Sequence, residues 1–172
     1  MRVITVKQPW AWAIIHGGKD VENRVRNLAG DYRGLVAIHA GKAWDASSYD
    51  SPKEWEIKRA ITSLENGWPA SDVEVWGAET IEPDDARYVR SAIIGVVDLT
   101  AVHRGYVGCP HGIEGSPWPE LDAYHLCLEN PRPLTEPIPW KGALGMRTLP
   151  DETTRLVLER AITTKEASDG TN

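Results

Sequence analysis

The chain has 172 residues, a length that suits one globular domain with a core of its own. Its net charge of −6 excludes a general nucleic-acid coating protein, which would be basic overall. No stretch approaches the roughly 20 apolar residues of a membrane span, so we expect no membrane contact.

The charge is distributed unevenly along the chain. Residues 1–45 carry a net +3, residues 46–90 a net −5 and residues 91–172 a net −4. A basic N-terminal third within an acidic protein favours a confined anionic ligand over a long duplex. The N-terminus shows no signal-peptide pattern and the chain has only two cysteines. We therefore expect a cytoplasmic protein in a reducing compartment.

The N-terminal third predicts a strand, a short helix and a second strand in succession. Residues 3–6 alternate and are β-branched, which is typical of a strand. Residues 8–16 then predict a helix that starts near Pro9 and ends at the glycine pair 17–18. An extended segment over 19–26 and a second strand over 32–40 follow.

Residues 44–90 predict an acidic, partly helical insertion that could act as a lid. Ser51 and Pro52 read as the start of a helix that reaches about Asn66, with another short helix over 83–89. The first of these helices is predicted to place four apolar residues on one broad face: Trp55, Ile57, Ile61 and Leu64.

The C-terminal half predicts mainly strands. The strongest covers residues 91–102, and shorter strands follow a long loop, over 124–128, 138–141 and 144–149. Prolines at 131, 133, 137 and 139 restrict strand pairing to edges. Residues 150–164 predict a helix and 165–172 a disordered tail. The order favours a single α+β domain over 1–164, a small β-barrel with external helices.

The densest polar cluster flanks the first predicted helix. Lys7, Gln8, Pro9 and Trp10 precede or begin it, and residues 19–24 follow it. Because that helix spans only a few turns, both ends can reach one cleft, where free N–H groups and Lys19 and Arg24 would attract an anion.

Lys19 and Glu22 could form an activated ammonium–carboxylate pair. In a regular strand the two side chains would face opposite ways, so sharing a cavity requires a bulge or a turn. In the alternative interpretation, Lys19 caps the helix and Glu22 pairs with Arg24 or Arg26 on the surface.

Further polar residues lie outside this cluster. His39 and Lys42 could contact phosphate or ribose, although His39 also fits a hydrogen-bonded structural histidine. Trp10 could stack on a base. The Cys-x-His and His-x-Cys pairs at 109–111 and 125–127 do not have the spacing of common zinc sites, so we expect no metal and no cofactor.

Several motifs resemble the ASCH domain family and occur in that family's order over residues 3 to about 149. They are Gln8-Pro9-Trp10-Ala11, the segment from Gly18 to Arg24, Tyr32-Arg33-Gly34, Ile38-His39-Ala40, Ile94 to Leu99, Leu128-Glu129-Asn130-Pro131, and Pro139-Trp140-Lys141-Gly142. The resemblance implies a PUA-like β-barrel and a cationic cleft between the Gln-Pro-Trp helix and the Lys-x-x-Glu-x-Arg segment. It also implies binding of RNA or a nucleotide.

The same resemblance implies a possible hydrolase or ribonuclease. Some small family members hydrolyse acetylcytidine with a Lys, a Thr and a Glu; Lys19 matches the Lys, whereas the Thr position is Glu22 here. That mechanism cannot be carried over intact, because a carboxylate does not normally replace a hydroxyl as acyl acceptor. A water activated by Glu22, with Lys19 stabilising the oxyanion, is the alternative, and Glu129 is a second candidate acid. The acidic region 46–90 and the overall charge favour a third role that does not come from the resemblance, that of a protein-interaction adaptor.

Overall fold

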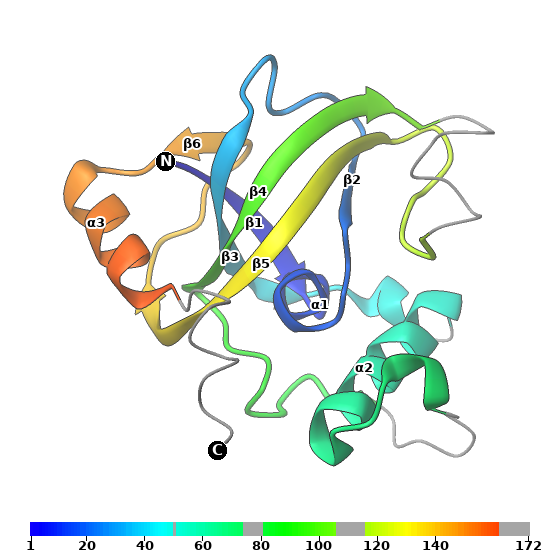
Figure 1. The fold of residues 1–172 in the computed structure, drawn as a ribbon. Helices are drawn as coiled ribbons and strands as arrows, with labels where there is room; N and C mark the ends of the chain where they lie inside the picture. The colour runs from blue at the N-terminus through cyan, green and yellow to red at the C-terminus, as the bar shows by residue number, and fades with distance from the viewer. Residues whose placement is uncertain (50, 74–80, 106–115, 162–172) are drawn as a thin grey trace.

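A computed structural model describes residues 1–49, 51–73, 81–105 and 116–161. Its centre is a six-stranded sheet with the order β2-β5-β4-β3-β1-β6 (Figure 1). The strands are β1 (Arg2–Gln8), β2 (Val21–Arg24), β3 (Gly34–Trp44), β4 (Ala92–Arg104), β5 (Tyr124–Pro139) and β6 (Met146–Thr148). Only β1 and β3 pair in parallel; the other neighbours are antiparallel.

The described residues form three α-helices: α1 (Trp10–His16), α2 (Pro52–Asn66) and α3 (Asp151–Arg160). Helices α1 and α3 pack on the sheet, whereas α2 packs against α1. Two short 3-10 helices accompany α2, η1 (Ala46–Ser48) and η2 (Ala70–Asp72). The mixed α+β class is confirmed. The closed β-barrel is not, because among the described residues the sheet is open and β2 and β6 each pair on one side.

The alternation of apolar residues along the strands gives the sheet two buried faces. On β1, Ile4 and Val6 point to the face covered by α1, whereas Val3 points to the opposite face, where Val157 of α3 packs. The helix α1 is itself buried on two sides. Ala11, Ile14 and Ile15 meet the sheet, while Trp12 and Ala13 pack with residues of α2 and its flanking segments.

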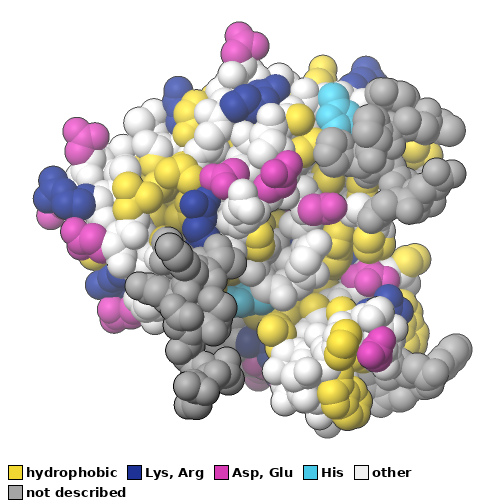
Figure 2. Space-filling view, in the orientation of Figure 1, with side chains coloured by type: hydrophobic (Ala, Val, Ile, Leu, Met, Phe, Trp, Pro, Cys, Tyr) yellow, Lys and Arg dark blue, Asp and Glu magenta, His cyan; other side chains and the backbone are white. Residues whose placement is uncertain are grey.

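The second predicted helix matches α2 at both ends. The Ser51 side chain accepts a hydrogen bond from the Glu54 N–H, Pro52 occupies the first turn, and Gly67 ends the helix in the left-handed region. Its predicted broad apolar face is wrong, because Ile57 is fully buried but Trp55 and Leu64 are exposed. Figure 2 shows hydrophobic side chains gathered over this helix. The short helix predicted over 83–89 is also wrong, since this segment forms turns.

The proline-rich segment belongs to one long strand, β5, rather than to two short ones. β5 pairs with β4 along most of its length, whereas β2 covers its other side only over 124–127. The four prolines lie beyond β2, where that other side carries a single bridge, from Leu134 to Ala161. Pairing on one side tolerates proline, which cannot donate to a second neighbour.

The C-terminal helix predicted over 150–164 is confirmed as α3, but it ends at Arg160, earlier than predicted. Residues 162–164 and the predicted tail over 165–172 lie outside the described residues. In the part of the chain that the structure describes, no helix is long and apolar enough to cross a membrane.

Gln8 fixes the position of α1 relative to the strands. Its side chain is fully buried: Oε1 accepts a hydrogen bond from the Trp12 N–H at 2.9 Å, and Nε2 donates one to the Val89 carbonyl at 2.8 Å. The amide thus caps the first turn of α1 and links it to the segment that leads into β4.

We predict that Gln8→Met lowers the free energy of unfolding by about 1–3 kcal/mol, because a buried donor and a buried acceptor lose their partners. Urea denaturation measures the change, with the exposed Lys7→Met as the matched control. Equal midpoints and slopes for the two variants would contradict this role.

Candidate functional site

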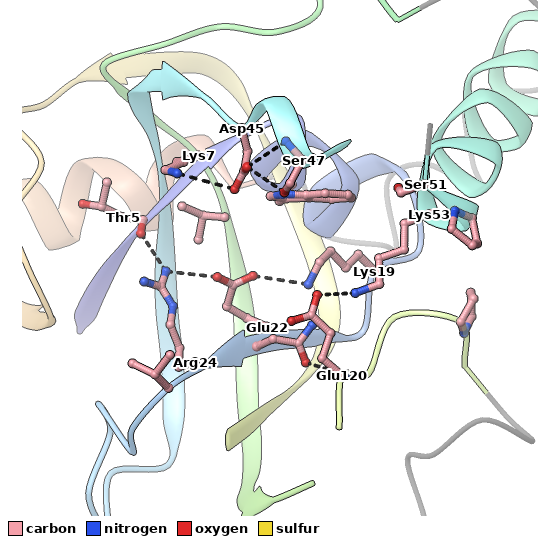
Figure 3. A pocket seen from close by; sticks show the side chains of 16 residues that line it. Thr5, Lys7, Lys19, Glu22, Arg24, Asp45, Ser47, Ser51, Lys53 and Glu120 are labelled. Carbon is pink, nitrogen blue, oxygen red and sulfur yellow. Dashed lines mark hydrogen bonds and ion pairs between the residues drawn. The ribbon is translucent and has the colours of Figure 1, made fainter. Parts of the chain in front are cut away.

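A pocket of about 780 Å³, here called the central pocket, opens beside the N-terminus of α1. Its walls come from β1, β2, the segment after β3, the start of α2 and the segment before β5 (Figure 3). Five of the residues predicted from sequence line it: Lys7, Trp10, Lys19, Glu22 and Arg24. The segments that build this pocket are far apart in sequence and meet only in the folded chain.

Lys19, Glu22 and Arg24 form a chain of ion pairs in the central pocket (Figure 3). Lys19 Nζ lies 3.2 Å from Glu22 Oε2, and Arg24 Nη2 lies 3.0 Å from Glu22 Oε1. The turn that this geometry requires is made at Gly18, whose φ of +67° favours glycine, before β2 begins at Val21. The carboxylate therefore contacts both cations, so the Lys19–Glu22 and Glu22–Arg24 pairs considered from sequence occur together, with Glu22 buried rather than on the surface.

Burial changes the chemistry of Lys19. Its side chain is 4% exposed, and its ammonium group also donates a hydrogen bond to the Val21 carbonyl. Burial lowers the pKa of Lys19, and the neighbouring Glu22 carboxylate opposes that shift without cancelling it. A lysine with a lowered pKa in a pocket marks a candidate for acid–base or electrostatic catalysis.

Two further ion pairs bring acidic groups to the rim. Lys53 pairs with Glu120, and Lys7 Nζ lies 3.6 Å from Asp45 Oδ2. Partial burial would raise the pKa of Asp45, but hydrogen bonds from Ser47, the charge of Lys7 and a hydrogen bond from Trp10 lower it overall. The described lining therefore holds four basic and three acidic side chains, which is closer to neutral than the predicted cationic cleft.

Sequence reasoning missed several residues of the central pocket. Asp45, Ser47, Lys53 and Glu120 line it, although they come from three separate stretches of the chain. Asn23 places the last of these, because its Oδ1 accepts a hydrogen bond from the Glu120 N–H at 3.1 Å. The Glu22-Asn23-Arg24 motif could have pointed to Asn23, but no local pattern marks the others.

The remaining predicted residues lie elsewhere. Gln8 and Pro9 are buried beneath the pocket and do not line it. Glu129 is exposed on β5, where it pairs with Asp98 of β4, and it does not line the central pocket either. His39 and Lys42 line a second cavity of about 1000 Å³, here called the side pocket.

His39 has a structural environment. Its Nε2 lies 2.9 Å from the Trp140 carbonyl, which can only accept, so Nε2 carries the hydrogen and Nδ1 accepts from the Thr5 hydroxyl at 3.2 Å. Burial lowers the pKa of His39, against the hydrogen bond to Trp140. The imidazole is therefore neutral at pH 7 and ties the loop after β5 to β1.

Of the two Cys–His pairs considered for zinc, the structure describes one. His125 and Cys127 lie on β5 near His103, and Cys127 Sγ is 3.7 Å from His103 Nδ1. Cys109 and His111 lie outside the described residues. Within the described ranges, no three His, Cys, Asp or Glu side chains are grouped to hold a metal ion.

No known family model matches this sequence. Among solved structures, a variant of ZmASCH from Zymomonas mobilis is 16% identical, with 94% of this chain and 98% of that chain covered and a TM-score of 0.52. ASCH from Zymomonas mobilis is also 16% identical, covering 94% of this chain and 96% of that one with a TM-score of 0.49. The first of these likenesses agrees with the fold expected from the sequence motifs. The chain therefore has the fold of an ASCH-domain protein.

Proposed function

We propose that the central pocket binds a nucleobase of RNA or of a nucleotide. The observation that supports this most directly is the composition of its walls. Trp10 offers part of an aromatic surface, and carboxylate and ammonium groups surround it at nearly balanced charge. A base presents a flat face for stacking and an uncharged edge of donors and acceptors, which suits such a lining better than a phosphate does. The ASCH fold agrees with this role.

The geometry also fixes where the polar groups lie before a ligand arrives. Glu22 is held by two cations, and Arg24 Nη2 donates a second hydrogen bond to the Thr5 carbonyl at 2.8 Å. Groups that are already oriented lose less conformational entropy when they bind a ligand.

We predict that Trp10→Leu weakens binding of a ten-nucleotide single-stranded RNA by about 1–3 kcal/mol, the usual contribution of one stacked base. Fluorescence anisotropy at low salt measures the affinity. The control is Trp68→Leu, because Trp68 is 55% exposed and does not line the pocket. Thermal melting shows whether each variant is folded, since the Trp10 ring packs edge-on against Trp118. Equal affinities for the two folded variants would refute base stacking on Trp10.

Hydrolysis of an acylated nucleoside is a second candidate function, and the Lys19–Glu22 pair favours it. An ionised Glu22 can take a proton from a water molecule that attacks the amide carbonyl. The charged ammonium of Lys19 can stabilise the oxyanion of the tetrahedral intermediate. Glu22 then gives its proton to the leaving nitrogen as the C–N bond breaks, which releases the free amine and the carboxylic acid product. This scheme needs no hydroxyl nucleophile, which agrees with Glu22 at the position of the family's Thr.

If this second function is correct, Glu22→Gln and Lys19→Met each lower the turnover of N4-acetylcytidine by about 10²-fold or more. Mass spectrometry of the released cytidine and acetate measures the rate. The control is Glu136→Gln, whose side chain is 72% exposed outside the central pocket. Turnover that survives in Glu22→Gln or in Lys19→Met would eliminate this mechanism. Absence of turnover in the unmodified protein would eliminate the function.

The pH dependence of that reaction follows from the direction of the Lys19 shift. Because Lys19 must be charged to stabilise the oxyanion, turnover falls as pH rises through its lowered pKa. We predict an alkaline limb centred below the ordinary lysine value of 10.5. A pH–rate profile, with circular dichroism to confirm folding at each pH, measures it. A limb at or above that ordinary value would show that Lys19 does not act in this way.

A further inference from the structure

The side pocket adjoins the central pocket and differs from it in charge. Thr5, Lys7 and Arg24 line both, so the two cavities share one wall. The described residues around the side pocket include four basic side chains, Lys7, Arg24, Lys42 and Lys141, and no Asp or Glu. Among the described residues, the carboxylates that pair with Lys7 and Arg24, which are Asp45 and Glu22, line the central pocket.

Two of these cations, Lys42 and Lys141, have no carboxylate partner among the described residues. Lys42 and Lys141 are exposed, and neither forms an ion pair among the residues that the structure describes. Lys42 follows the buried part of β3, and Lys141 follows β5. Two segments that are far apart in the sequence thus bring two ammonium groups without an ion pair to one cavity, a combination that attracts an anion.

The fold keeps the floor of this cavity rigid. His39 holds the Trp140 carbonyl, and the Ala143 N–H donates a hydrogen bond to the Thr5 hydroxyl at 3.3 Å. Gly142 packs so closely here that a Cβ would lie 2.7 Å from His39 Cε1. Beside the cations, Trp140 is half-buried and Leu144 is 89% exposed, which adds an apolar surface. Cations next to an aromatic side chain such as Trp140 are typical of surfaces that bind single-stranded nucleic acid.

We propose that the side pocket is a phosphate subsite, and that the ligand is a single-stranded oligonucleotide rather than a free nucleoside or nucleotide. This inference rests on the proposed function: one base occupies the central pocket, and the phosphate of a neighbouring nucleotide in the same strand, which a mononucleotide lacks, lies among Lys7, Lys42 and Lys141. Arg24 connects the two, because it contacts Glu22 of the central pocket and lines the side pocket as well.

The test compares the double variant Lys42→Ala/Lys141→Ala with a matched control, Arg104→Ala/Arg155→Ala. The control also removes two exposed positive charges, one at the far end of β4 and one on α3, and neither lines the side pocket. The probes are a ten-nucleotide single-stranded RNA and cytidine 5′-monophosphate. Anisotropy for the RNA and calorimetry for the nucleotide are recorded between 50 and 200 mM salt, a range of about four-fold over which phosphate contacts change affinity strongly.

We expect the lysine variant to bind the RNA several-fold more weakly than the control. The slope of log K against log salt should decrease in magnitude by about 0.7 for each lysine that neutralises a phosphate. Binding of cytidine 5′-monophosphate should not change. An RNA affinity and slope equal to those of the control would overturn the subsite. An equal loss for the mononucleotide would assign the side pocket to a terminal phosphate and overturn the oligonucleotide.

The two proposals fail in different ways. If the lysine variant binds RNA normally while Trp10→Leu binds it weakly, the base pocket stands and the phosphate subsite is wrong. If the reverse holds, the side pocket binds the RNA backbone and the base pocket is wrong. If the unmodified protein binds the mononucleotide but not the RNA at low salt, the oligonucleotide is excluded.

Discussion

The buried ammonium group of Lys19 is the constraint on which the central pocket depends. An isolated charge at this depth would be strongly disfavoured, so it requires a carboxylate within reach. Gly18 supplies the turn that brings Glu22 to it, and Glu22 in turn holds Arg24 against β1. One local backbone conformation therefore orients three charged side chains.

The local parts of this arrangement can be predicted from sequence, whereas the long-range parts cannot. Ser51 and Pro52 determine the start of α2 through contacts within its first turn. The glycines after α1 likewise indicate a turn through their own backbone conformation. Lys53 and Glu120 meet because α2 and the segment before β5 pack together, and nothing in either segment alone specifies that contact. For Glu129 the prediction fails in the other direction. The family motif suggests a site residue, whereas the strand register places Glu129 outside the central pocket.

The same limit explains why the sequence predicts a more positively charged site than the central pocket of the structure. Counting charges along residues 1–45 gives a basic region, since the acids of later segments are not included. Folding brings Glu120 to the central pocket, and Asp45, at the end of that region, turns toward Lys7 (Figure 3). In the described lining of the side pocket, two cations without an ion pair, Lys42 and Lys141, lie across the shared wall.

This separation of charge has a consequence for ligand choice. A pocket with balanced ion pairs discriminates by hydrogen-bond pattern and shape, because a net charge on the ligand gains little there. A cavity with only cations attracts any phosphate and discriminates poorly among bases. With Arg24 and Lys7 in the wall between them, a ligand that fills both pockets must carry an uncharged aromatic group and an anion on the same chain. A nucleic-acid strand repeats that pair of groups at every residue, so it meets both requirements with one short segment.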